Sequence, residues 1–317
     1  MDTLQAAFAD INIRKSWSVY YVRRQRRFAL NSAVDLSWRH NADSRLFNRG
    51  EWSEMAEDTQ RFSDGTAYEQ FMGRWTRAIG TIFLDWLTPP ADARWLDIGC
   101  GTGVFTDLIV STCSPATVVA IDPSEPQIEI ARKKAIAQRV DFRVEDSQKL
   151  PFSDNTFDIV VSALVINFIS DRSQALAEMC RVCRPHGVIA GYVWDFAAQR
   201  GPVELIRHGL HQVGAKNPPH PGTEHSGLDA LTSLFARAKL TEIGSRTIDV
   251  TMSFADFNEF WVSQTPSYTP MGKRIAALSE TDREKVIDWV RARLPAGPDG
   301  RITYSARANA IKALAPA

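Results

Sequence analysis

An acid and three glycines, each separated from the next by one residue, form the strongest chemical signal in the chain. Residues 95–103 read Trp-Leu-Asp-Ile-Gly-Cys-Gly-Thr-Gly. An apolar run that ends in glycines predicts a buried strand turning sharply into a helix. Glycine suits that turn because it has no Cβ to keep a ligand away from the backbone. We therefore expect a ligand-binding loop made by Asp97, Gly99, Cys100, Gly101 and Gly103.

A second acid, Asp122, directly follows the next apolar run at residues 117–121, and Pro123 comes after it. An acid at the tip of the second strand of an open α/β sheet is placed to accept hydrogen bonds from ribose hydroxyls. The order Asp-x-Gly-x-Gly-x-Gly differs from the dinucleotide fingerprint, which seats a pyrophosphate on a helix N-terminus. Asp97 would repel a pyrophosphate but could accept from a cationic amino group. These features favour an adenosine-containing cofactor with an α-amino group, such as S-adenosylmethionine.

The glycine loop resembles that of class I S-adenosylmethionine-dependent methyltransferases, in particular the methyltransferase type 11 or UbiE-like small-molecule group. Residues 144–152, Val-Glu-Asp-Ser-Gln-Lys-Leu-Pro-Phe, are similar to the third cofactor loop of that family. The resemblance implies that Asp146 accepts from the adenine amino group and that the Ser147 backbone amide reaches a ring nitrogen. It is strong over about residues 65–195 and includes Arg-Val-Cys-Arg-Pro-His-Gly at 181–187, where His186 is expected to adopt a positive φ.

The resemblance also implies a helix that covers the cofactor. Aromatic and aliphatic residues from Tyr68 to Trp86 recur at steps of three and four, which predicts an amphipathic helix. In the family this element lies over the methionine end of the ligand. Tyr68 and Arg74 are therefore counted among the cofactor-binding residues, together with Pro123 beside the ribose acid.

Strand and helix patterns alternate along the rest of the chain. The expected helices cover 103–112, 125–138, 172–183 and 227–239, and the expected strands cover 94–98, 117–121, 139–144, 157–162, 187–193, 241–251 and 301–309. Such alternation predicts an α/β fold with helices on both faces of a parallel sheet and a ligand at the carboxyl ends of the strands. The resemblance implies a Rossmann-like sheet of seven strands, mostly parallel, with the last strand antiparallel.

The chain divides into two expected regions. We expect residues 1–60 to be a poorly ordered N-terminal extension or a translated leader, with a basic nucleic-acid arm and a targeting peptide as alternatives. We assign residues 61–317 to a methyltransferase domain with a helical insertion at 253–297. Four aromatic residues of the insertion have helical spacing and would cap the pocket or form a helical core: Phe254, Phe257, Phe260 and Trp261.

Composition narrows the class of partner. The 317 residues include 37 Lys and Arg against 37 Asp and Glu, so the whole chain offers no basic surplus for nucleic acid. No apolar run is long enough to predict a membrane-spanning helix. Four cysteines in a chain this long, without a secretion signal, indicate reduced thiols and a cytoplasmic location. The oligomeric state stays open.

No metal site is expected. Cys180 and Cys183 form a C-x-x-C at the end of a predicted helix, without the second pair that a zinc site would need, so we interpret them as packing residues. His208 and His211 could share a helix face, but they lack matching carboxylates. Together with His220 and His225, they are expected to line a substrate pocket or to face water.

The sequence therefore predicts a methyltransferase that moves a methyl group from S-adenosylmethionine to a small-molecule acceptor by in-line displacement, leaving S-adenosylhomocysteine. A nicotinamide-dependent oxidoreductase, a non-catalytic S-adenosylmethionine-binding protein and a methyltransferase of RNA or protein are the alternatives. The acceptor and its nucleophilic atom (O, N, C or S) stay open. No catalytic residue is assigned, and Tyr192, His208 and His211 are the candidates if the acceptor must lose a proton.

Overall fold

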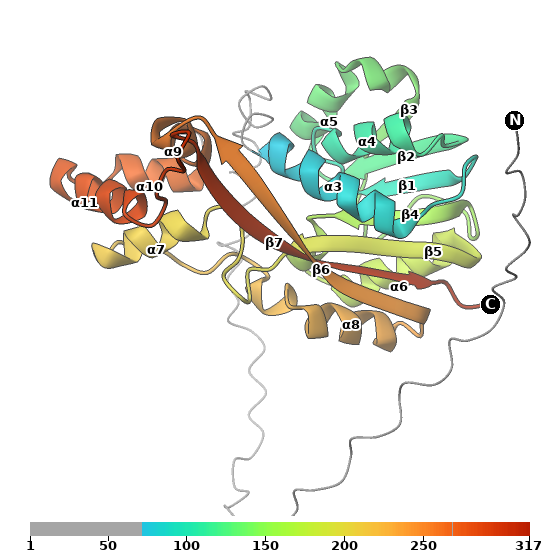
Figure 1. Cartoon of the computed structure of the whole chain (residues 1–317). Helices are drawn as coiled ribbons and strands as arrows, with labels where there is room; N and C mark the ends of the chain where they lie inside the picture. The colour runs from blue at the N-terminus through green and yellow to red at the C-terminus, as the bar shows by residue number, and fades with distance from the viewer. Residues whose placement is uncertain (1–71, 268) are drawn as a thin grey trace, which may run out of the picture. The chain divides into compact units, whose positions relative to one another are not determined.

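The computed structural model describes residues 72–317 except 268, so the predictions for residues 1–60 and for Tyr68 lie outside the described residues. Seven strands form one sheet in the order β3-β2-β1-β4-β5-β7-β6 (Figure 1). Neighbouring strands from β3 to β5 are parallel, and β7 runs antiparallel to both β5 and β6. The predicted Rossmann-like α/β fold with an antiparallel last strand is confirmed. The strands are β1 (Arg94–Ile98), β2 (Thr117–Asp122), β3 (Val140–Val144), β4 (Phe157–Ala163), β5 (Cys183–Trp194), β6 (Thr241–Phe254) and β7 (Ile302–Leu314).

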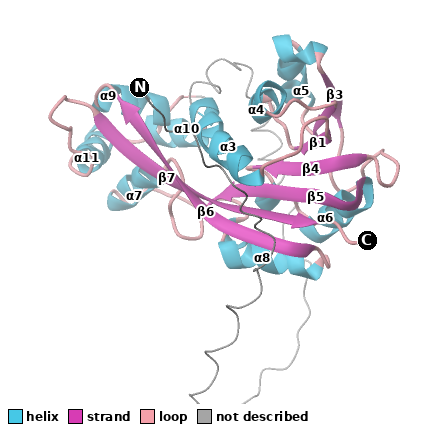
Figure 2. Cartoon of the chain, turned by 45° about the vertical axis from the view of Figure 1, so that its right-hand side comes forward, coloured by secondary structure: helices cyan, strands magenta, loops and turns pink. Residues whose placement is uncertain are grey.

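Helices cover both faces of this sheet (Figure 2). One face packs against α3 (Arg74–Leu87), α4 (Val104–Thr112) and α5 (Glu125–Arg132), and the other packs against α6 (Arg172–Val182) and α8 (Leu228–Arg237). Adjacent residues of β1 show why both faces must be covered. Trp95 belongs to the first hydrophobic cluster and Leu96 to the second, and both are fully buried. Successive strand side chains point to opposite faces, so an unbroken apolar strand needs a helix layer on each side.

Several predicted boundaries were wrong. The strand expected over 301–309 is β7, which continues to Leu314. The helix expected over 125–138 ends at Arg132, and a separate 3₁₀ turn follows at Ala135–Gln138. β5 begins at Cys183, four residues before its predicted start, because an irregular register at the beginning of β4 lets Phe157 pair with Cys183. In β5, Cys183 pairs with Phe157 and the regular pairing resumes at Val188. His186 lies between these two positions with φ +60°, the positive φ that was predicted for it.

The carboxyl ends of the strands carry additional helices. β5 is followed by α7 (Glu204–Gln212), and α9 (Phe257–Gln264), α10 (Pro270–Ala276) and α11 (Glu280–Arg291) lie in the sequence between β6 and β7. Figure 1 shows all four at the same end of the sheet, away from the end where the chain terminates. Side chains cap three of these helices at their first turn: Asp256, Thr269 and Ser279 each accept from a backbone N–H three residues later.

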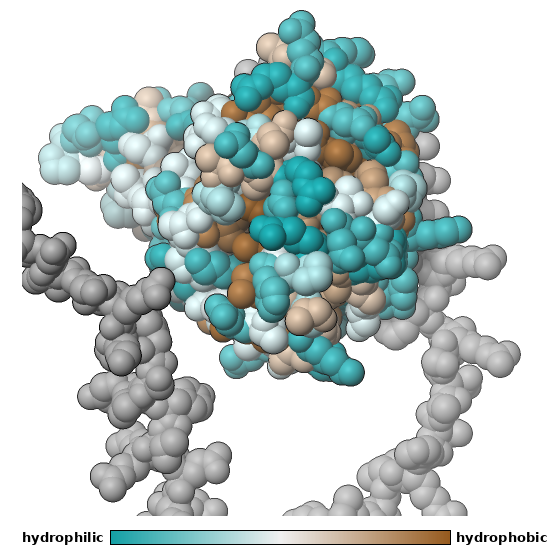
Figure 3. Space-filling model, turned by 90° about the vertical axis from the view of Figure 1, so that its right-hand side faces the viewer, coloured by the Kyte–Doolittle hydropathy of each residue, from teal (hydrophilic) through white to brown (hydrophobic). Residues whose placement is uncertain are grey.

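The opposite end of the sheet is held by ion pairs. Asp158 at the start of β4 accepts from the guanidinium groups of Arg94 on β1 and Arg184 on β5, at 3.0 and 2.7 Å. These hydrogen bonds lower the pKa of the Asp158 carboxyl. Figure 3 views the molecule from this side, where hydrophilic residues surround smaller hydrophobic patches. The ion pairs join the amino ends of three neighbouring strands, which is a structural role.

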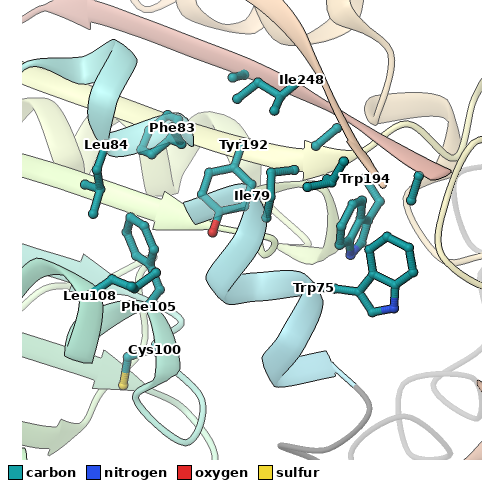
Figure 4. Packing of buried hydrophobic residues seen from close by; sticks show 14 of the residues in the cluster. Trp75, Ile79, Phe83, Leu84, Cys100, Phe105, Leu108, Tyr192, Trp194 and Ile248 are labelled. Atoms are coloured by element: carbon teal, nitrogen blue, oxygen red, sulfur yellow. The ribbon is translucent and has the colours of Figure 1, made fainter. Parts of the chain in front are cut away.

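Aromatic side chains fill the core between α3 and the sheet (Figure 4). Phe83 of α3 is fully buried, with its ring centroid 4.8 Å from that of Tyr192 on β5 and 6.0 Å from that of Phe105 on α4. These contacts fix α3 against α4 and β5. Trp75, near the start of the same helix, packs edge-on against the rings of Trp194 and Tyr304.

Replacing Phe83 tests this packing. We expect Phe83→Ala to lower the free energy of unfolding by about 3–5 kcal/mol, because it leaves a cavity among fully buried rings. Phe83→Leu should cost less. Val262→Ala is the control, since Val262 is 60% exposed and its loss should change stability by no more than about 0.5 kcal/mol. Urea unfolding followed by circular dichroism measures all three, and a Phe83→Ala cost equal to that of the control would contradict the assigned packing.

Candidate active site

The loop after β1 is drawn tightly against the end of β2. The backbone amides of Gly99 and Cys100 both donate to the carbonyl oxygen of Ile121, at 2.8 and 2.9 Å. Gly99, Gly101 and Gly103 all have positive φ, at +74°, +54° and +80°. L-residues with side chains rarely adopt this conformation, so the sequence needs glycines here for the turn itself.

The space beside these three glycines differs from one to the next. A Cβ on Gly99 would lie 2.5 Å from the Val165 side chain, and one on Gly103 would lie 3.1 Å from Phe142. The nearest atom to a Cβ on Gly101 is 3.8 Å away, the Oε1 of Gln127. Gly99 and Gly103 are therefore packed against protein, whereas Gly101 borders open space that a ligand can fill.

Asp122 is held rigidly beside Gly101. Its Oδ2 accepts from the Gly101 amide and its Oδ1 from the Ser124 amide, both at 2.9 Å. Burial raises the pKa of the Asp122 carboxyl, and the two backbone hydrogen bonds oppose that rise. Each carboxylate oxygen has a further lone pair for another donor. Pro123, which follows it, is exposed at the strand tip.

Asp97 is fully buried beneath the loop. Its Oδ2 accepts from the Thr106 hydroxyl of α4 at 2.7 Å, while Oδ1 has no hydrogen-bond partner among the described residues. Burial raises the pKa of Asp97 to about 7. A buried carboxyl of this kind is stabilised either by a bound proton or by a nearby cation. The sequence analysis expected Asp97 to accept from a cationic amino group. Cys100 is also buried, and burial raises the pKa of its thiol.

The segment after β3 is organised by its own side chains. Asp146 is exposed, and its Oδ1 accepts from the backbone amide of Gln148 at 2.9 Å. Gln148 in turn accepts from Ser170 and from the Asp171 amide through its Oε1. Ser147 is half-buried between them. Asp146 therefore stands at the tip of an ordered turn, with capacity left for one more donor.

Arg181 explains the Leu-Pro-Phe sequence that follows. Its guanidinium donates to the carbonyl oxygens of Leu150 and Phe152, at 2.9 and 2.7 Å, and to the carboxylates of Glu178 and Asp154. Glu178 also accepts from the Leu150 amide. Arg181, a partly buried residue of α6, thus fixes the course of the chain between Asp146 and β4.

Sequence reasoning missed Gln127. This residue of α5 is 5% exposed, and its Oε1 makes no hydrogen bond to a described residue. It is the nearest group to the open side of Gly101. A buried amide without a partner is costly, so its position beside this space points to a ligand donor. Its place three residues after Ser124, the N-cap of α5, was the available signal.

Arg74 faces the helices between β6 and β7. Its guanidinium donates to Glu259 at 3.0 Å and to the Ser253 carbonyl oxygen at 3.3 Å. These bonds tie the start of α3 to α9. Contact between Arg74 and the methionine end of a cofactor stays a prediction.

Two of the candidate bases are poorly placed for proton transfer. Tyr192 is fully buried between Phe83 and Phe105, and burial raises its pKa well above the ordinary value, which disfavours the phenolate form; its role as a base stays a prediction. His211 is exposed on α7. His208, on the same helix, is paired through Nε2 with Gln199 at 2.8 Å.

A different histidine lies in a built polar cluster. His220 Nε2 is 2.9 Å from Glu204 Oε1, and Glu204 Oε2 is 3.3 Å from Arg207 Nε. The side chains of Glu204 and Arg207 are 6% and 10% exposed. The His220 ring stacks on Phe196, which follows β5, with centroids 4.1 Å apart.

The cysteine pair matches its predicted packing role. Burial raises the pKa of Cys180 to about 11 and that of Cys183 to about 12, so both are protonated and unreactive thiols at neutral pH. Within residues 72–317 apart from 268, no three His, Cys, Asp or Glu side chains are gathered as metal ligands would be. In that same part of the chain, every helix is too short or too polar to cross a membrane.

Comparison with known proteins identifies the domain. Residues 96–191 match the family model described as "Methyltransferase domain". This stretch holds the glycine loop, Asp122, Asp146 and the start of β5. The chain carries a class I S-adenosylmethionine-dependent methyltransferase domain.

Curated relatives match parts of this chain of different lengths. A ubiquinone/menaquinone biosynthesis C-methyltransferase from Desulfotalea psychrophila is 37% identical over 98 residues, covering 31% of this chain and 40% of the relative. An uncharacterized protein from Mycobacterium tuberculosis is 29% identical over 203 residues, or 61% of this chain and 73% of the relative. The chain spans less than half the length of the first curated relatives it matches.

The methyltransferase fold extends past the matched region. The crystal structure of phosphoethanolamine N-methyltransferase 2 from Haemonchus contortus, in complex with S-adenosylmethionine, is similar in fold with a TM-score of 0.50 and 19% identity. The similarity covers 82% of this chain and 57% of that one.

The buried carboxyl of Asp97 predicts a pH effect on the protein without cofactor. Its pKa is about 7 in the folded state against 3.8 as the model-peptide value, so the folded chain holds this proton more tightly than the unfolded chain. The contribution of Asp97 to the free energy of unfolding is full below about pH 4. It declines by roughly 1.4 kcal/mol per pH unit as the pH rises towards about 7.

Urea unfolding between about pH 5 and 8 measures the decline. Asp97→Asn should flatten the slope, because an amide accepts from Thr106 without titrating. Glu129→Gln, at an exposed position on α5, should leave the slope as in the wild type. An unchanged slope in Asp97→Asn would show that Asp97 is already ionised in the folded protein.

Proposed function

We propose that this protein transfers a methyl group from S-adenosylmethionine to a small-molecule acceptor. The observation that carries the proposal is the pairing of Asp122 with the open Gly101 backbone at the tips of β1 and β2. A carboxylate fixed by two backbone amides keeps its remaining lone pairs in one direction, which suits the two hydroxyls of a ribose.

The residues around Gly101 fit this cofactor. The open side of Gly101 gives room for close approach of the ligand, and Gln127 Oε1 is a buried acceptor without a partner. Asp97 supplies a buried carboxylate on the side where an α-amino group would place a positive charge. On this proposal Asp146 accepts from the adenine amino group, with the Ser147 amide on a ring nitrogen. Gly99, Cys100 and Gly103 shape the loop, and Pro123 borders the ribose.

The cofactor supplies an electrophilic methyl group on a sulfonium. The protein holds the acceptor's nucleophile in line with that group and excludes water, and positioning of this kind is worth about 7–11 kcal/mol. All four cysteines are free thiols, in keeping with a reducing, cytoplasmic setting. A nicotinamide-dependent oxidoreductase is the rival on this fold, and binding measured with both cofactors separates the two.

Asp122 is the first test of the proposal. Charge-assisted hydrogen bonds are worth about 1.5–3 kcal/mol each, so we expect Asp122→Ala to weaken S-adenosylmethionine binding roughly ten- to a hundredfold. Isothermal titration calorimetry measures the change. Glu129→Ala, an exposed acid seven residues later, serves as the control and should bind as the wild type does. A loss of less than about threefold in Asp122→Ala would place the ribose elsewhere.

Gly101 is the second test, with a control that the chain itself provides. Gly101→Val should abolish S-adenosylmethionine binding, because the branched side chain occupies the space that the ligand needs. Gly214 has a similar φ of +66° and no atom within 4 Å of a Cβ, so Gly214→Val carries the same backbone strain away from the site. Both variants should stay folded by circular dichroism. If Gly101→Val still binds, the open side of this loop is not the ligand site.

A further inference from the structure

A small pocket lies between α6 and α8, and no residue assigned to the cofactor lines it. Its volume is about 170 Å³, and its walls come from the start of α6, the 3₁₀ turn Thr223–His225 and α8. Arg237 and Ser173 are exposed, so the pocket can be reached from solvent. The side chains that decide its chemistry are those of Ser170, Asp171, Arg172, Ser173, His225 and Arg237.

The pocket gathers positive charge from three separate elements. Arg172 begins α6, His225 ends the 3₁₀ turn and Arg237 ends α8. Burial lowers the pKa of the His225 ring, and the charges of Arg172 and Arg237 lower it further. Both guanidinium groups are therefore close enough to the imidazole to repel a third positive charge. Like charges gathered in this way attract an anion.

The nearby acids do not neutralise these arginines by ion pairing. Asp171 is the acid in the lining, and its Oδ1 accepts from a backbone amide as the N-cap of α6. Glu224 stands next to the pocket, where its Oε1 is 3.0 Å from His225 Nε2, and its side chain is 71% exposed. Neither carboxylate forms an ion pair with an arginine of the pocket. The lining therefore sets two arginines against one carboxylate.

Several hydrogen-bond donors of the pocket are free for a ligand. Arg172 donates to the Ile169 carbonyl oxygen through Nη1, and its Nε and Nη2 make no bond to a described residue. The Arg237 guanidinium and the Ser173 hydroxyl also have no hydrogen-bond partner among the described residues. A guanidinium presents five N–H donors in a planar fork that matches the oxygens of an anion.

The number and origin of these donors favour a phosphate group over a carboxylate. A carboxylate has two oxygens in one plane, and one guanidinium fork satisfies both of them. A phosphate group has three terminal oxygens in a tetrahedral arrangement, so it can accept from two forks and a hydroxyl at once. Arg172 and Ser173 reach the pocket from α6, and Arg237 reaches it from α8, which supplies that set from two sides.

The pocket also adjoins the turn that carries Asp146. The Ser170 hydroxyl and the Asp171 amide both donate to Gln148 Oε1 at 3.0 Å. The Nε2 of the same side chain donates to Asp146 Oδ1 at 3.1 Å. Gln148 therefore connects one wall of the pocket to the acid that is proposed to hold the adenine.

We propose that this pocket binds the phosphate group of a small molecule and that Arg172 and Arg237 hold it. The Ser173 hydroxyl donates to the same group, and the His225 ring borders it. Free phosphate and a phosphate ester present the same oxygens to these donors. The proposal does not depend on the proposed function, because no residue assigned to the cofactor lines the pocket.

Phosphate binding can be read from the His225 ring in the full chain. Histidine rings labelled with ¹⁵N are followed by NMR during titration with inorganic phosphate at constant pH and ionic strength, and the signals lost in His225→Gln identify the reporter. We expect these signals to shift saturably with a dissociation constant of about 1 mM, the strength of a few charge-assisted hydrogen bonds. His211, exposed on α7, is the control reporter and should show no saturable shift. A His225 ring that behaves like His211 overturns the proposal.

Arginine variants show whether the pocket itself is responsible. Arg172→Gln and Arg237→Gln should each weaken phosphate binding roughly tenfold or more. Arg237→Lys should lie between Arg237→Gln and the wild type, since lysine keeps the charge but not the fork. Arg139→Gln is the matched control, because Arg139 is exposed directly before the edge strand β3 and its loss removes the same charge elsewhere. Circular dichroism checks that each variant is folded, and equal weakening by Arg139→Gln and Arg237→Gln overturns the site.

Three probes decide the class of ligand. If glycerol 3-phosphate binds as tightly as inorganic phosphate, the pocket takes a phosphate ester, whereas binding of inorganic phosphate alone identifies the free ion as the ligand. Acetate should bind roughly tenfold more weakly, and acetate that binds as tightly as phosphate overturns the phosphate class. The titrations contain no S-adenosylmethionine, so they decide this inference whether or not the proposed function holds.

Discussion

The tight apposition of the β1 loop and the end of β2 is the constraint on which the rest of the site depends. Two consecutive amides, those of Gly99 and Cys100, share the Ile121 carbonyl oxygen, and the next residue binds Asp122. The loop can come this close only because Gly99 has no side chain to collide with Val165. One turn therefore fixes the acid at the β2 tip, the open face at Gly101 and the position of the residues after β4.

The carboxyl edge of the sheet gathers polar groups that the core could not otherwise contain. Asp97, Gln127 and Asn167 are all buried there, each with at least one side-chain atom lacking a partner among the described residues. Each such group costs stability when the site is empty. At the other edge, Asp158 instead has both carboxylate oxygens paired with arginines. The two edges differ because β1 to β5 are parallel, so their carboxyl ends all lie at the same edge.

Much of the fold followed from local pattern. Apolar strands of five to seven residues, broken by glycines and capped helices, predicted the first five strands, and the resemblance added the last two. The spacing of Asp97, Gly101 and Asp122 suggested the class of cofactor. Failures came where long-range contacts override local preference. The early start of β5 depends on an irregular pairing with Phe157, and the end of α5 at Arg132 coincides with its guanidinium binding the Phe142 carbonyl oxygen of β3.

The sequence by itself determined the domain type and predicted the cofactor loop, because residues within a few positions of one another make those features. Only the tertiary structure decided which histidine has chemical neighbours. His208, His211 and His220 look alike in sequence, and Tyr192 looked equally available. Folding buries Tyr192 between two rings, leaves His211 exposed and brings Glu204 to His220 across 15 intervening positions. Burial and partners are properties of the packed chain, and no local pattern encodes them.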